Sequence, residues 1–121
     1  MHTVAFISTE FGDDLILSFA ISDGQDPMSI TSLTLIRTPK FEPLLPVEDR
    51  GVNISLEGRT EDMNDFVQHV VYSKNERTVS IKTQLHAYEL DLTRVDEEEL
   101  LDMQKLFQRL NHDGNFQYAC V

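Results

Sequence analysis

A chain of 121 residues suits one domain with one core, and its 21 acidic against 10 basic residues give a formal net charge of −11. Such a surface repels phosphate backbones and anionic lipid, which argues against binding to nucleic acid or to a membrane surface. The natural electrostatic complement is a protein partner with a basic surface, unless the acidity only keeps the protein in solution.

The N-terminal third has the composition of a short series of strands. Residues 3–8 and 15–22 are rich in β-branched and aromatic side chains, and a turn-favouring Gly-Asp pair lies between them. This pattern predicts a hairpin over about residues 3–22. A loop is expected at 23–27, and the alternation within 29–38 predicts a third strand.

Residues 39–51, PKFEPLLPVEDRG, carry three prolines. Proline cannot donate to a strand ladder and restricts the residue before it, so we expect an ordered connection across an edge or over the sheet. Apolar side chains on a long ordered loop usually pack beneath it. Phe41, Leu44 and Leu45 are therefore expected to plug one end of the core. The alternative is a functional stretch at residues 35–43, LIRTPKFEP, where two basic side chains flank a proline before Phe41, because function concentrates where irregular chain is positioned by a rigid sheet.

Three further strands are predicted between residues 51 and 92. Residues 51–58 alternate as a half-buried strand does, and an acidic loop follows at 59–65. Residues 66–73 and 77–92 favour two strands joined by a tight turn. The apolar parity reverses within 77–92, which predicts a bulge or break near residues 86–87.

The acidic run VDEEELLDM, residues 95–103, has the pattern of a helix start. Asp96 suits the N-cap, and Glu99 three residues later completes a capping box. Val95 and Leu100 have the spacing of a hydrophobic staple. The sequence therefore predicts an amphipathic helix over about 96–110, with this apolar stripe: Leu100, Met103, Leu106, Phe107 and Leu110.

The same acids are weak candidates for a metal or acid–base site. Residues 97–99 fan around the helix axis, and no His has the Glu-x-x-His spacing. A calcium loop fails as well, because setting Gly114 at its glycine position puts Arg109 at the first ligand position. Residues 111–114 are instead expected to stop the helix before a last strand at 115–121.

No other residue set points to catalysis or to a cofactor. The four histidines lack zinc spacing, the serines lack a nucleophile elbow, and the glycines form no phosphate loop. The single Cys120 allows no intrachain disulfide, which fits a reducing compartment. The first residues lack the pattern of a signal peptide, and no apolar run has membrane length. The expectation is a cytoplasmic protein, not an enzyme, without metal or cofactor.

Two sets of residues are the candidate contacts. The basic and aromatic side chains around the proline-rich segment predict a ligand pocket, and the acids of two turns predict contacts with a basic partner. The pocket candidates are Arg37, Lys40, Phe41 and His86, and the acidic candidates are Asp13, Asp14, Glu61 and Asp62.

The order of these features is similar to that of small bacterial immunity proteins of polymorphic toxin systems. The matching stretches are DDLILSFAIS, LTLIRTPKFE, RGVNISLEG, TVSIKT and EEELLDMQKLFQRL. They cover about half of the chain as a pattern without a diagnostic motif, and the last strand departs from it. The resemblance implies a non-enzymatic protein that binds and blocks a toxin, and it transfers no site residues.

We therefore predict one α+β domain over residues 1–121, in which a mostly antiparallel sheet of six or seven strands carries a C-terminal helix. The expected core is Phe6, Leu17, Phe19, Leu35, Ile54, Val71, Ile81, Leu90 and Phe107. Three functions remain open: a module that binds a basic protein, a small-ligand binder or enzyme with a pocket near Arg37, Lys40 and His86, and a homodimer that pairs exposed edge strands.

Overall fold

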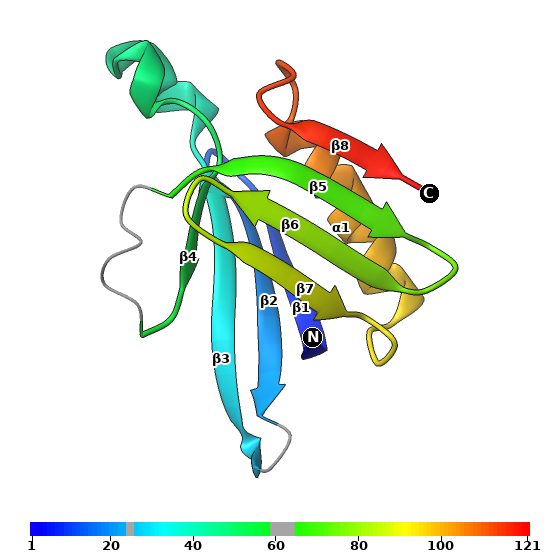
Figure 1. The fold of residues 1–121 in the computed structure, drawn as a ribbon. Coiled ribbons are helices and arrows are strands. Elements are labelled where there is room, and N and C mark those ends of the chain that lie inside the picture. The colour runs from blue at the N-terminus through cyan, green and yellow to red at the C-terminus, as the bar shows by residue number, and fades with distance from the viewer. Residues whose placement is uncertain (24–25, 59–64) are drawn as a thin grey trace.

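The computed structural model describes residues 1–23, 26–58 and 65–121, and their strands form one mixed sheet in the order β4-β3-β2-β1-β7-β6-β5-β8 (Figure 1). The strands are β1 (His2–Phe11), β2 (Leu15–Asp23), β3 (Asp26–Arg37), β4 (Asn53–Leu56), β5 (Val67–Ser73), β6 (Thr78–Thr83), β7 (Ala87–Asp91) and β8 (Gln117–Cys120). All neighbours are antiparallel except β1 with β7 and β5 with β8. The α+β fold with one C-terminal helix is confirmed.

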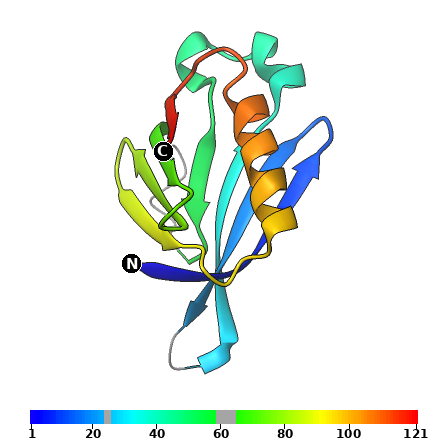
Figure 2. The ribbon, with the colours of Figure 1, turned by 90° about the vertical axis from the view of Figure 1, so that its right-hand side faces the viewer.

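The sheet curls until its two ends approach each other. β1 joins β7 through only two residue pairs, at His2 and Thr3. On the far side, the start of β5 meets β4: the N–H of Val67 donates to the carbonyl of Val52 at 3.0 Å, and an isolated bridge joins Asn53 to Phe66. Figure 2 shows helix α1 (Glu97–Leu110) lying against one face of this curled sheet, over β1 and β2.

Helix α1 begins where the acidic run predicts, but the side chains act differently. Asp96 occupies the N-cap position, and its side chain makes no capping hydrogen bond. Glu99 instead reaches the sheet, where its Oε1 accepts from the backbone N–H of Ile7 at 2.6 Å. β7 has left β1 by that point, so Glu99 supplies an acceptor that the strand ladder lacks. The capping-box detail is wrong, while the helix and its buried stripe are confirmed.

Two predicted core residues face solvent. Phe6 is 45% exposed and Val71 is 41% exposed, while Ile7 and Val70 beside them are buried. Phe6 borders the register irregularity between Val4 and Phe6 in β1, and Val71 follows by two residues the irregularity between Val67 and His69 in β5. One extra residue shifts the alternation, so the neighbouring side chain turns inward instead. The other seven predicted core residues are buried.

The predicted strand 77–92 is two strands. The break near residues 86–87 is confirmed, and the chain reverses there so that β6 and β7 pair antiparallel. Buried Asp65 holds the turn: its carboxylate accepts from the Thr83 hydroxyl at 2.6 Å and from the Leu85 N–H at 3.1 Å. This reversal brings the sheet in the described residues to eight strands, where the sequence predicted six or seven.

Candidate functional site

Arg37, at the end of β3, is the centre of a buried ion-pair network. It is 2% exposed, and each of its five N–H groups has an acceptor. Nε and Nη2 donate to Glu42 at 2.8 and 2.9 Å, while Nη1 and Nη2 donate to Asp113 at 2.9 and 2.8 Å. The remaining Nη1 bond reaches the carbonyl of Leu110 at 2.7 Å. This network, the Arg37 clamp, leaves the guanidinium no donor for a ligand.

The Arg37 clamp fastens both ends of the proline-rich segment to the body of the protein. Glu42 also accepts from the N–H of Gly51 at 3.2 Å, so one carboxylate joins Arg37, before the segment, to Gly51, after it. Gly51 has a φ of 133°, and a Cβ there would lie 2.7 Å from the side-chain oxygen of Asn115. Glycine is therefore required where the segment returns to β4.

Both carboxylates of the clamp are held ionised. Hydrogen bonds from Arg37 lower the pKa of Asp113 to about 2. Burial by itself would raise the pKa of Glu42, but its bonds from Arg37 and Gly51 outweigh burial and lower it. Burial likewise opposes the charge of Arg37, and its two carboxylate partners raise its pKa above the ordinary value. The clamp thus holds one positive charge against two negative charges.

These lowered pKa values predict acid-dependent stability. An ordinary aspartate has a pKa of 3.8, so the contribution of Asp113 is complete above that pH and is lost as pH falls toward about 2. Its side chain is 45% exposed, and solvent screening limits the loss to about 1 kcal/mol. Urea unfolding at several pH values between about 2 and 5 measures it. Asp113→Asn should flatten the slope, and an equal slope in both proteins would contradict the assignment.

The segment between the two ends of the clamp projects from one end of the sheet (Figure 1). It folds as two 3-10 helices, η1 (Pro39–Leu44) and η2 (Val47–Asp49), because prolines favour such short turns over a strand. Arg50 braces it by donating twice to the carbonyl of Leu45, at 3.2 and 3.0 Å. We call residues 39–49 the protrusion.

The protrusion turns apolar side chains toward solvent. Phe41 is 52% exposed, Leu44 82%, Leu45 43% and Val47 74%. The expectation that Phe41, Leu44 and Leu45 plug the core is therefore wrong. The physical reason is that Glu42, bound to Arg37, takes the inward position of η1 and leaves the apolar side chains outside.

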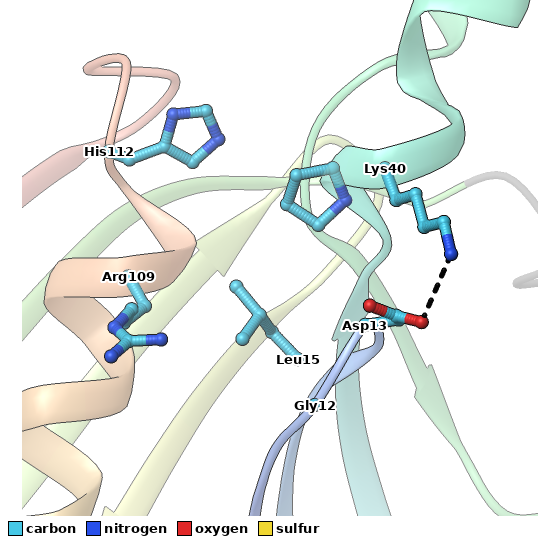
Figure 3. A pocket seen from close by; sticks show the side chains of 7 residues that line it. Gly12, Asp13, Leu15, Lys40, Arg109 and His112 are labelled. Atoms are coloured by element: carbon cyan, nitrogen blue, oxygen red, sulfur yellow. Dashed lines mark hydrogen bonds and ion pairs between the residues drawn. The ribbon is translucent and has the colours of Figure 1, made fainter.

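Two cavities flank η1. One, of about 500 Å³, lies between the protrusion and the sheet, and Phe41, Leu45, Asp49 and Phe66 are among its lining residues. The other, of about 380 Å³, lies between η1, the β1–β2 turn and the end of α1. In Figure 3, Arg109 and His112 stand on one side of this second cavity and Asp13 and Lys40 on the other, with Leu15 between them.

The structure separates the predicted pocket residues. Arg37 and Phe41 line the 500 Å³ cavity and Lys40 lines the 380 Å³ cavity, whereas His86 lies in the β6–β7 turn and lines neither. Neither of these two cavities is lined by Arg37, Lys40 and His86 together.

The acidic candidates have separate roles. Asp13 pairs with Lys40 at 3.3 Å, and both side chains are exposed. Asp14 accepts from the Thr38 hydroxyl at 2.7 Å, which joins the β1–β2 turn to the start of η1. Glu61 and Asp62 lie outside the described residues.

Sequence reasoning missed Glu42, Asp113 and the Leu110 carbonyl as partners of Arg37. The sequence places Asp113 in the turn that ends the helix, and its partner Arg37 lies 76 residues away. No local pattern signals such a pairing. The basic side chains beside a proline, followed by Phe41, are the signal that points to this part of the chain as a site.

The chain matches no protein-family model, no curated protein and no solved structure. Over residues 1–23, 26–58 and 65–121, no helix is long and apolar enough to cross a membrane. Over the same ranges, no three His, Cys, Asp or Glu side chains are grouped as metal ligands.

Proposed function

We propose that the chain is a non-enzymatic module that binds a basic partner protein through the protrusion, in the manner of an immunity-type inhibitor. The observation that carries the proposal is the exposure of Phe41, Leu44, Leu45 and Val47 on one short segment. Clustered apolar side chains on a surface, rimmed by polar groups, are typical of protein-binding sites.

The charge around the protrusion supports a basic partner. Exposed Glu48 and Asp49 follow the apolar side chains directly, and the Arg37 clamp beneath them carries a net charge of −1 from one guanidinium and two carboxylates. The chain as a whole carries −11. Opposite charges across an interface speed association and exclude wrong partners more than they raise affinity.

The way the protrusion is mounted also supports binding. The Arg37 clamp holds its base, and Arg50 and the prolines restrict its backbone. A segment ordered before association loses less conformational entropy on binding than a loose loop does. The buried ion pairs are thus placed where they keep the apolar side chains presented.

The test has two steps. The full chain is used to pull down a partner protein from a lysate, and the affinity of the purified partner for the chain is then measured. Leu44→Ser combined with Val47→Ser should weaken binding by about tenfold or more, because exposed apolar anchors supply most interface energy. The matched control is Leu101→Ser, a leucine 54% exposed near the start of α1. Affinity should also fall as salt rises.

Several outcomes would overturn the proposal. These are a partner with an acidic surface, binding indifferent to salt, or equal losses in the double variant and the control. Sedimentation of the chain alone tests whether the protrusion instead mediates self-association. A concentration-dependent dimer that the double variant abolishes would assign the protrusion to a second copy of this chain.

A further inference from the structure

The 380 Å³ cavity combines apolar side chains with three basic side chains and one acid. Leu15 and Pro39 are among its lining residues, and Arg109 and His112 stand on the side formed by the end of α1 (Figure 3). Lys40 lies on the opposite side, paired with Asp13. In a chain with only 10 Lys and Arg residues, two of them and a histidine meet here.

Arg109 is the cation without a carboxylate partner in this group. Among the described residues no acid lies within ion-pair distance of it, and its guanidinium lies 5.8 Å from the centre of the Phe11 ring. Arg37 and Arg77 both bind carboxylates, and Arg50 binds a carbonyl. The guanidinium N–H groups of Arg109 are therefore available to a ligand. A carboxylate fits their planar, forked geometry best.

The last carbonyls of α1 are mostly hydrogen-bonded, which favours an anion near this end of the helix. A helix C-terminus ordinarily repels negative charge, because its last carbonyls have no partners. Here Arg37 binds the Leu110 carbonyl, and the N–H groups of Asn111 and His112 bond the carbonyls of Phe107 and Arg109. Asp113, the nearest acid along the chain, is turned to Arg37. These bonds occupy three of the last four carbonyls of α1, which weakens the repulsion of an anion there.

We propose that this cavity binds a carboxylate carried on a small apolar group. The volume falls within the range of small-molecule sites. Arg109 would hold the carboxylate as a fork, His112 would donate a further hydrogen bond, and the apolar group would lie on Leu15 and Pro39. Phosphate fits less well, because the side chains of Leu15 and Pro39 offer its other oxygens no donors. The cavity shares Pro39 and Lys40 with the protrusion, but binding of a small carboxylate there requires no partner protein.

The carboxylate has two sources, a free small acid or the C-terminus of a peptide, and the experiment separates them. Amide NMR titrations of the full chain would use benzoate, hexanoate, acetate, hexylamine and N-acetyl-Ala-Phe with its C-terminal amide counterpart. Benzoate and hexanoate should bind with constants on the order of millimolar, which ligands of this size allow. They should shift the signals of Gly12, Arg109 and His112, whereas hexylamine should shift none of these.

Comparing the peptide with benzoate assigns the source. A peptide acid that binds about tenfold more tightly than benzoate, while its amide does not bind, indicates a chain terminus. Equal or weaker peptide binding indicates a free acid. Both results support the carboxylate site.

Variants of Arg109 make the proposal falsifiable. Arg109→Gln should weaken benzoate binding about tenfold or more, because it removes a charge-assisted pair of bonds. Arg109→Lys should be intermediate, since it keeps the charge without the fork. Lys105→Gln is the matched control, an exposed cation one turn earlier on α1 that does not line the cavity. No saturable binding, equal affinities in Arg109→Gln and Lys105→Gln, or shifts confined to other residues would overturn the proposal.

Discussion

Replacing Arg37 with methionine is expected to lower the free energy of unfolding by about 3–5 kcal/mol, the cost of removing one partner from a buried ion pair. The substitution leaves Glu42, whose side chain is 11% exposed, without its counter-ion. It also takes the donor from the Leu110 carbonyl at the end of α1. Asp113 suffers less, because its side chain is 45% exposed and water can replace the guanidinium.

Urea unfolding monitored by circular dichroism measures this loss. The control is Arg109→Met, an arginine without a carboxylate partner in the described residues, which should change stability by about 0.5 kcal/mol or less. Adding Glu42→Gln to Arg37→Met should recover part of the loss, since it removes the uncompensated charge. A loss below about 1 kcal/mol in Arg37→Met, or no recovery in the double variant, would contradict the role of the clamp.

The same substitution connects stability to the proposed docking. Arg37 holds the start of the protrusion by donating to Glu42, and the same carboxylate accepts from the N–H of Gly51 just after its end. Without the clamp, the segment would pay more conformational entropy when it binds. Partner affinity should therefore fall in Arg37→Met although Leu44 and Val47 are unchanged.

Local patterns predicted the elements of this fold well. The 3.6-residue stripe from Leu100 to Leu110 specifies α1, and strict alternation specifies strands such as β4. Parity also revealed the break before β7, although not that the chain reverses there. A reversal depends on Asp65, which reaches the turn from 20 residues earlier.

Prediction fails where a single inserted residue or a contact distant in sequence determines which way a side chain faces. Phe6 and Val71 lie in strands as expected, yet a single irregularity near each turns it outward. Basic side chains beside a proline indicate residues 35–43 as a stretch of interest. The outward direction of the apolar side chains of the protrusion depends on the Arg37 clamp, whose partners lie 5 to 76 residues away. Sequence spacing alone therefore does not predict that these side chains face solvent.

Phe107 and Phe6 form a matched test of the core, because the sequence predicts both as buried and only one is. Phe107 is fully buried, and its ring lies 6.5 Å from that of Phe116 and 5.4 Å from that of Tyr118. Phe107→Ala should lower the free energy of unfolding by about 3–5 kcal/mol through lost burial and the cavity it leaves. Phe6→Ala, at 45% exposure, should cost about 1 kcal/mol or less.

The two variants should also differ in where they loosen the fold. Phe107 packs against Phe116 and Tyr118, and β8 joins the sheet only through β5 within the described residues. Phe107→Ala should therefore speed amide hydrogen exchange in β8 more than in β2, which is held on both sides. Phe6→Ala should leave β8 protected. Equal losses of stability in the two variants, or unchanged exchange in β8, would mean that α1 does not hold this edge of the sheet.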